Sequence, residues 1–292
     1  MVSDYLIVTD ATADLSAEIT EKLDIRVIPM NFMLGDKEYL FHPSGSGISL
    51  DGFYEAIDAD TPVSTSQIVP SAYVEFFEPL LKEKKDIIYI CFSSGLSGCY
   101  GASVIAVDSL REKYPDRRIT TIDSLCASIG EGMLVYQAAV KRIEGMDYDE
   151  MITYIENSRR KMCHWFLVKD LNQLKRGGRI SPLEAALGTT LGIVPVISTD
   201  DEGKLVVITK IHGLKKAIRY LVDRLRNDSF DKPAKLVYIG HGHCPEYAKL
   251  IEDEIKNEGL AQETVTLQIG PVIGSHVGSG MCAVLFEGEQ YA

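Results

Sequence analysis

The chain has 292 residues and a formal net charge of −12, with 46% hydrophobic and 25% charged residues. This composition is typical of a soluble globular protein, and the length allows one large domain or two ordinary ones. The acidic balance weighs against nucleic acid as a partner and against adsorption to anionic lipid, because both need clustered lysine and arginine.

The cysteines and the most apolar stretches indicate the compartment. Six cysteines, at positions 91, 99, 126, 163, 244 and 282, are scattered without a C-x-x-C pair, which is typical of free thiols in a reducing compartment. No basic segment of a secretory signal precedes the first apolar run. Residues 269–286 contain no Asp, Glu, Lys or Arg, but their glycines and proline predict a glycine-rich loop and a core strand, not a membrane helix. We therefore expect a cytoplasmic protein without stable membrane insertion.

In chain order, the N-terminal part alternates apolar strands with amphipathic helices. We predict strands at 5–9, 26–31, 87–92 and 118–123, a hairpin at 32–41, helices at about 16–23, 51–58, 71–82, 100–114 and 128–143, and a further helix start at Asp147. A hydroxyl-rich loop is expected at 61–70. This alternation predicts a Rossmann-like parallel α/β domain at 1–160.

The pattern changes after about residue 160. We predict strands at 163–168, 193–198, 204–209, 236–239, 264–269 and 281–286, helices at about 183–191, 213–226 and 245–257, and a tight basic turn at 175–182. Strand pairs joined by a turn are mixed here with crossovers. This mixture predicts a second α/β domain with a mixed sheet at 161–292.

One turn stands out for its chemistry. Residues 93–98, Ser93-Ser94-Gly95-Leu96-Ser97-Gly98, follow a buried strand and precede a helix; we call them the serine turn. Backbone N–H groups and the positive end of the helix dipole meet at such a point and bind phosphate or carboxylate. The alternative is that the serines only cap the helix and the glycines only allow the turn.

Three more polar turns lie in apolar surroundings: Thr65-Ser66-Gln67, Lys175-Arg176-Gly177-Gly178-Arg179, and Ile273-Gly274-Ser275-His276-Val277-Gly278. Between glycines, His276 could donate to an anion or orient a hydroxyl, or it could be a satisfied structural histidine. Asp10, Asp14 and Asp123 end strands, where they could serve a reaction or cap loops.

Signatures of metal sites and of common enzymes are absent. His241-Gly242-His243-Cys244 has no third ligand fixed by spacing, so we predict no metal there. The chain also lacks a G-x-S-x-G elbow, a Walker lysine motif and a clean G-x-G-x-x-G after its first strand.

Taken in their order and spacing, these stretches resemble the DegV family of bacterial fatty-acid-binding proteins. The resemblance spans nearly the whole chain, from Val8-Thr9-Asp10 and Ala13-Asp14-Leu15 through the polar turns and Ile122-Asp123-Ser124 to the segment around His276. It implies two α/β domains with a long-chain fatty acid in the tunnel between them. It also implies that Thr65 and Ser97 hold the carboxylate, with Ser94, Gly95 and His276 close by. No catalytic residue is implied, and no cofactor besides the bound fatty acid.

The same resemblance implies a partner. Family members are the binding subunit of a fatty acid kinase, whose dihydroxyacetone-kinase-like subunit uses ATP to form an acyl phosphate for phospholipid synthesis. We expect Lys175, Arg176, Arg179 and His212 to dock that subunit, although a merely solvated basic face is the alternative. His212 stands where many relatives carry a docking arginine. Further departures from the family pattern are Ile68, Cys99 and Ser279.

Two other functions are compatible with the residues. The chain could be a stand-alone enzyme that acts on a phosphorylated or carboxylated metabolite at the serine turn. It could also be a binding module for another anionic lipid or a small acid.

Overall fold

The computed structural model describes residues 5–169, 171–181 and 192–289. The chain divides into two compact units: the first comprises Met1–Asn31, Tyr39–Gly47 and Ser66–Arg160, and the second comprises Phe32–Glu38, Ile48–Thr65 and Lys161–Ala292. Two stretches before residue 66 therefore belong with the C-terminal half of the chain. The domain bounds 1–160 and 161–292 stay a prediction.

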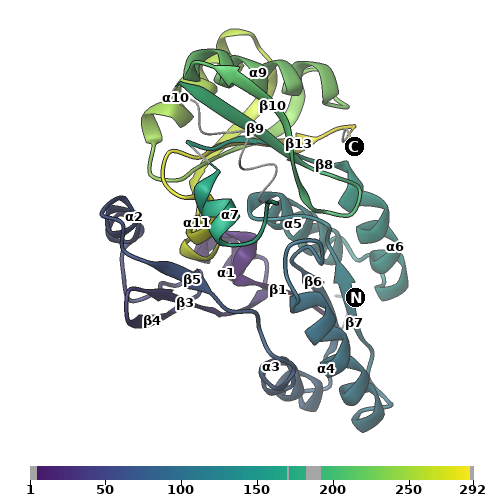
Figure 1. The fold of residues 1–292 in the computed structure, drawn as a ribbon. Helices are drawn as coiled ribbons and strands as arrows, with labels where there is room; N and C mark the ends of the chain where they lie inside the picture. The colour runs from purple at the N-terminus through teal and green to yellow at the C-terminus, as the bar shows by residue number, and fades with distance from the viewer. Residues whose placement is uncertain (1–4, 170, 182–191, 290–292) are drawn as a thin grey trace. The chain divides into compact units, whose positions relative to one another are not determined.

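The first unit contains the predicted parallel sheet (Figure 1). Strands β1 (Tyr5–Asp10), β2 (Ile25–Ile28), β6 (Asp86–Cys91) and β7 (Ile119–Asp123) pair in parallel in the order β2-β1-β6-β7. β1 is buried along its whole length, as expected of an inner strand in a sheet flanked by helices. The helices are η1 (Ala11–Ala13), α1 (Ala17–Lys22), α3 (Pro70–Lys82), α4 (Cys99–Lys113), α5 (Ile129–Ile143) and α6 (Tyr148–Ser158), followed by η2 (Arg159–Lys161).

Two predictions for residues 26–70 need correction. The single strand at 26–31 is interrupted at Pro29, which has no N–H to donate, so that β2 ends at Ile28 and β3 (Met30–Leu34) begins a new strand. The loop at 61–70 contains a third short strand, β5 (Val63–Thr65), which pairs antiparallel with β3 and places Thr65 opposite Phe32. With β4 (Lys37–Phe41) these strands form the sheet β4-β3-β5. Helix α2 (Leu50–Asp58) precedes β5.

The second unit contains the predicted mixed sheet. Its six strands are β8 (Met162–Leu167), β9 (Ile193–Thr199), β10 (Leu205–His212), β11 (Ala234–His241), β12 (Ala261–Gln268) and β13 (Cys282–Glu287), in the order β10-β9-β8-β13-β11-β12. Only β11 and β12 pair in parallel, and the other neighbours are antiparallel. The fold class predicted from the sequence is therefore confirmed in both sheets.

Helices α9 (Leu214–Asp228) and α10 (Pro245–Asn257) pack on this sheet, α9 against β8, β9, β10 and β13 and α10 against β11 and β12 (Figure 1). Their apolar residues, such as Leu221 and Ile251, form one buried core with Trp165 and Val284 of the strands. The helix predicted at 183–191 lies outside the described residues. In the described ranges, no helix is long and apolar enough to cross a membrane.

Two short helices replace segments that the sequence predicts as turns. Helix α7 (Asn172–Arg176) includes the first two basic residues of the predicted tight turn and stops at Gly177-Gly178, where Gly178 has a φ of +73°. Helix α11 (Pro271–Val277) occupies the predicted glycine-rich loop. The core strand expected after that loop is present as β13.

Candidate functional site

Thr65 and His276 come together within the second unit. Thr65 is the last residue of β5, His276 lies in the last turn of α11, and Thr65 Oγ1 is 2.8 Å from His276 Nε2. The other ring nitrogen of His276, Nδ1, is buried and has no hydrogen-bond partner among the described residues. We call these two residues the Thr65–His276 pair.

The protonation of the pair follows from its surroundings. Burial, and secondly the positive charge of Arg179, lowers the pKa of His276 to about 4, so the imidazole is neutral at pH 7. A proton on Nδ1 would leave a buried donor unsatisfied, which is costly, whereas a proton on Nε2 can be donated to Thr65 Oγ1. The Nε2–H tautomer is therefore favoured, and it leaves the Thr65 hydroxyl proton free to be donated to a ligand.

Close packing explains why α11 contains a glycine. Pro271 starts the helix at a position where no N–H is needed. A Cβ on Gly274 would lie only 2.7 Å from the Tyr54 hydroxyl and 2.9 Å from the Phe53 ring, so this face of the helix needs glycine. Tyr54 in turn donates a 2.9 Å hydrogen bond to the carbonyl of Ile269, just before the helix.

A cavity of about 340 Å³ adjoins the pair. It is lined by β5, α7 and α11, and its polar residues include Ser64, Thr65, Arg176, Arg179, Ser275 and His276. Arg179 Nη1 also donates a 2.6 Å hydrogen bond to the carbonyl of Gly177. Neutral donors and two guanidinium groups thus face one cavity, a combination that suits a carboxylate or a phosphate.

This arrangement differs from the separate roles that the sequence suggests. The sequence argument assigns Arg176 and Arg179 to a docking surface, whereas the structure places both with the Thr65–His276 pair. Lys175 is exposed on α7, and His212 is exposed at the end of β10, where Gly192 approaches its ring. The spacing of the basic turn gives no signal of this, because the rest of the cavity lining comes from distant parts of the chain, residues 57–65 and α11.

The serine turn lies in the first unit, and the backbone amides of residues 93–97 already donate hydrogen bonds there. Ser94 N donates to Asp123 Oδ1 at 3.1 Å, and Gly95 N donates to Ser93 Oγ at 3.2 Å. Ser97 N donates to the carbonyl of Ser93. The hydroxyl of Ser97 accepts from Cys99 N at 3.2 Å, at the start of α4. Its proton remains available for a ligand, but the amides of Ser94 and Gly95 do not.

Gln67 packs against the same turn. A Cβ on Gly98 would lie 2.2 Å from Gln67 Oε1, so the glycine makes room for this side chain. Since Gln67 follows Thr65 by two residues, the covalent chain holds their Cα atoms within about 7 Å of each other.

A buried polar network at the end of β1 contains a residue that the sequence analysis missed. Thr12 Oγ1 contacts Asp10 Oδ1 and lies 2.8 Å from Glu131 Oε2, while Thr9 donates to Glu131 Oε1 at 3.0 Å. One hydroxyl cannot supply protons to two carboxylates, so one of the two acids is protonated. Burial, and secondly the charge of Asp10, raises the pKa of Glu131 well above its usual range. We therefore assign the proton to Glu131, which sits in a G-E-G stretch that gives no local signal of burial.

The strand-end carboxylates all accept hydrogen bonds from loops. Asp10 accepts from Thr12 N at 3.0 Å and Phe92 N at 3.4 Å, Asp14 from the Ser128 hydroxyl at 2.6 Å, and Asp123 from Ser94 N at 3.1 Å. These bonds favour the loop-capping interpretation over a chemical role.

The histidines at and just after the end of β11 contact other protein groups. His243 Nδ1 is 3.3 Å from Asp51 Oδ1, and Cys244 N donates to His241 Nδ1 at 3.4 Å. Within the described part of the chain, no three His, Cys, Asp or Glu side chains gather as metal ligands.

Comparison with known proteins identifies the family. The family model described as "Uncharacterised protein, DegV family" matches residues 5–289. A DegV domain-containing protein of Clostridium perfringens is 36% identical over 285 residues, which cover 98% of each chain. Among solved structures, the fatty-acid-binding DegV family protein of Thermus thermophilus has a TM-score of 0.88 at 26% identity and covers 98% of this chain and 99% of its own. The fatty acid binding DegV family protein of Streptococcus agalactiae has a TM-score of 0.86 at 26% identity, covering 99% and 100%. The chain therefore belongs to the DegV family.

Proposed function

We propose that this protein binds a long-chain fatty acid and holds its carboxylate at the Thr65–His276 pair. The observation that carries the proposal is the 2.8 Å contact of Thr65 Oγ1 with a neutral, buried imidazole beside a cavity that Arg176 and Arg179 also line. The imidazole turns the hydroxyl proton toward the ligand, and the guanidinium groups offset the cost of burying a carboxylate. Support also comes from the two solved relatives, which are described as fatty acid binding.

Ser97 is proposed as the second hydroxyl donor. Its Oγ accepts from Cys99 N, so its proton can be donated to a carboxylate oxygen. The short chain link from Thr65 to Gln67, and the packing of Gln67 against Gly98, support placing both hydroxyls at one carboxylate. We propose that the acyl tail lies between the two predicted domains, as the resemblance implies.

The tail would supply most of the affinity. A tail of about fourteen methylenes contributes on the order of 11 kcal/mol, at about 0.8 kcal/mol for each buried group. The costs of association and ordering, about 4–15 kcal/mol, offset much of this. The head group therefore determines orientation and the tail determines retention.

The test is the amount of lipid that purifies with the protein. Thr65→Val combined with Ser97→Ala should sharply reduce the fatty acid released on denaturation, measured by mass spectrometry. The matched control is Thr153→Val with Ser109→Ala, two exposed positions on α6 and α4, which should retain the wild-type amount. Wild-type lipid in the Thr65 and Ser97 variant would refute the assignment.

We further propose that the chain is the non-catalytic binding subunit of a bacterial, cytoplasmic fatty acid kinase. In this role it presents the carboxylate to an ATP-binding subunit, which forms an acyl phosphate for phospholipid synthesis. Lys175 and His212 are the docking residues to test, because reversing the charge of Arg176 or Arg179 would also disturb the cavity beside the pair.

Reconstitution with a kinase subunit tests this role. Lys175→Glu with His212→Glu should leave the bound fatty acid unchanged and reduce acyl phosphate formation at low kinase concentration, since two added carboxylates change the electrostatic complementarity that speeds association. Unchanged turnover in that variant would contradict the docking role while leaving the lipid assignment intact.

A further inference from the structure

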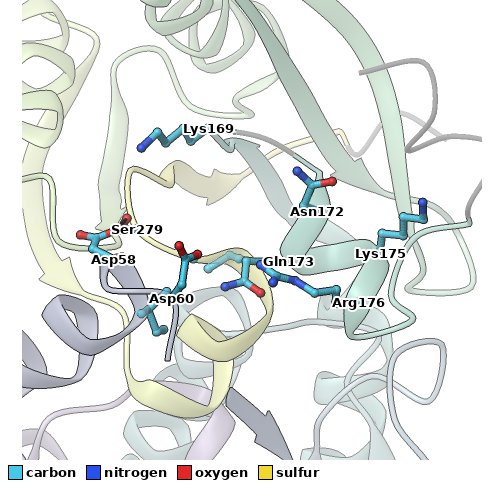
Figure 2. A pocket seen from close by; sticks show the side chains of 11 residues that line it. Asp58, Asp60, Lys169, Asn172, Gln173, Lys175, Arg176 and Ser279 are labelled. Atoms are coloured by element: carbon cyan, nitrogen blue, oxygen red, sulfur yellow. Dashed lines mark hydrogen bonds between the residues drawn. The ribbon is translucent and has the colours of Figure 1, made fainter. Parts of the chain in front are cut away.

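A second and larger cavity in the second unit has mixed charge. It measures about 650 Å³ and is lined by the end of α2, by α7 with the residues before it, and by the turn after α11 (Figure 2). In this view Asp58, Asp60 and Ser279 lie on one side, and Asn172, Lys175 and Arg176 lie on the other.

Among the described residues, the opposite charges around this cavity form no ion pairs with one another. Lys169, Arg176 and Asp60 form no ion pair or hydrogen bond with another side chain of the described residues. Asp58 accepts a hydrogen bond from Ser279 Oγ and has no cationic partner in the same ranges. Cations and carboxylates that line one cavity without pairing leave both kinds of group available to a ligand.

We propose that this cavity binds a phosphate ester that carries free hydroxyl groups, either a sugar phosphate or a nucleotide. Lys169 and Arg176 would hold the phosphate through charge-assisted hydrogen bonds, with Asn172 and Gln173 as further donors. Asp58 and Asp60 repel a phosphate but accept hydrogen bonds from hydroxyl groups, so they would orient the ester with its hydroxyl groups toward them. The volume falls within the range of small-molecule sites, about 300–1,000 Å³.

The cavity adjoins the one beside the Thr65–His276 pair. Both are lined by Asp60, Gln173 and Arg176. Lys169 and Asp58 line only the larger cavity, so variants at these two residues test the phosphate ester without touching the proposed lipid head group.

Calorimetric titration of the full chain tests the proposal with four probes. Ribose 5-phosphate carries phosphate and hydroxyls, inorganic phosphate and ribose each lack one feature, and AMP adds a base. We expect ribose 5-phosphate or AMP to bind more tightly than inorganic phosphate or ribose. Tighter binding of AMP than of ribose 5-phosphate identifies a nucleotide as the source, and the reverse order identifies a sugar phosphate. If neither ester binds more tightly than inorganic phosphate, or if neither ester binds at all, the proposal is overturned.

Two variants locate the binding. Lys169→Ala should weaken the ester by roughly tenfold, the usual effect of losing a charged hydrogen bond. Asp58→Asn should lower the affinity for ribose 5-phosphate severalfold, because a hydrogen-bond acceptor for its hydroxyl groups is lost. The affinity for inorganic phosphate should stay unchanged or rise, because a repelling charge is removed. Matched exposed controls, Lys22→Ala and Asp36→Asn, should match wild type. Wild-type affinity for the ester in both test variants would overturn the site, and retained fatty acid in each variant shows that the lipid site is intact.

Discussion

In the serine turn, the polar groups bond mainly to one another, whereas the Thr65–His276 pair leaves bonding capacity open beside a cavity. Ser94 N, Gly95 N and Ser97 N all donate to acceptors within the first unit. At the pair, one hydrogen bond joins two side chains, and His276 Nδ1 is buried with no partner among the described residues. The first region is held by many satisfied bonds and the second by packing around one bond.

This difference indicates what each region contributes to binding. Satisfied amides hold the serine turn in one conformation, and the buried network around Glu131 anchors Phe92 just before the turn through Asp10, so the turn can present the Ser97 hydroxyl at a fixed place. The pair is held less by hydrogen bonds and more by the close approach of Gly177 and Gly274 to their neighbours. Substitutions should therefore act through hydrogen bonding in the first region and through steric contact in the second.

The largest effect is expected at Glu131. Glu131→Ala removes a fully buried side chain and the partner of the Thr9 and Thr12 hydroxyls, which should lower the free energy of unfolding by about 3 kcal/mol. Glu131→Gln has nearly the shape of the protonated acid, so the free energy of unfolding of this variant should stay within about 1 kcal/mol of wild type. Urea unfolding measures both, with the exposed Glu150→Ala as the control. An equal loss in the Gln and Ala variants would show that Glu131 is ionised.

The sequence predicts the first region better than the second, for a physical reason. The serine turn follows from a local order of strand, turn and helix, which the structure retains with α4 beginning at Cys99. The pair depends on contacts distant in sequence: β5 pairs with β3, and Gly274 of α11 packs closely on Phe53 and Tyr54. From local sequence alone, the segments that form β5 and α11 are both predicted as loops. The proximity of Arg176 and Arg179 to the pair could not be predicted for the same reason.

The next effect is steric and belongs to the second region. A Cβ on Gly177 would lie 2.3 Å from His276 Nδ1, and the ring is held on its other side by Thr65. Gly177→Ala should therefore cost about 2 kcal/mol of stability, as overpacking usually does, and should reduce fatty acid retention. Gly101→Ala is the control, because that glycine is in α4 with open space around its Cβ, and the change should stabilise the helix slightly. If Gly177→Ala left the free energy of unfolding unchanged, the imidazole would be able to move away freely.

A pH effect on stability should arise from the pair. His276 has a folded pKa of about 4, below the unfolded value of 6.5, so the unfolded chain binds the proton first as the pH falls. Its contribution is therefore fully present above about pH 6.5 and is lost as the pH falls toward 4. Between pH 7 and pH 5.5 the loss should be about 1 kcal/mol. Urea unfolding at these two pH values measures the loss. The His276→Gln variant keeps a donor for Thr65 but does not titrate, so its free energy of unfolding should fall correspondingly less between the two pH values. The same pH dependence in both proteins would rule out His276 as its source.

The smallest effect is expected for a steric substitution at Gly98 in the serine turn. A Cβ on Gly98 would lie 2.2 Å from Gln67 Oε1, which is as close as the contact at Gly177. The obstructing atom here is the end of a flexible, exposed side chain, so Gln67 can turn aside, and Gly98→Ala should cost only about 0.5 kcal/mol in urea unfolding. The two glycines have similarly short Cβ contacts, but the side chain in the way is exposed and mobile at Gly98 and buried and held at Gly177. The difference in stability loss between the two variants therefore measures the difference between the two regions. A cost at Gly98 equal to that at Gly177 would show that packing also fixes the serine turn, and the contrast between the two regions would then fail.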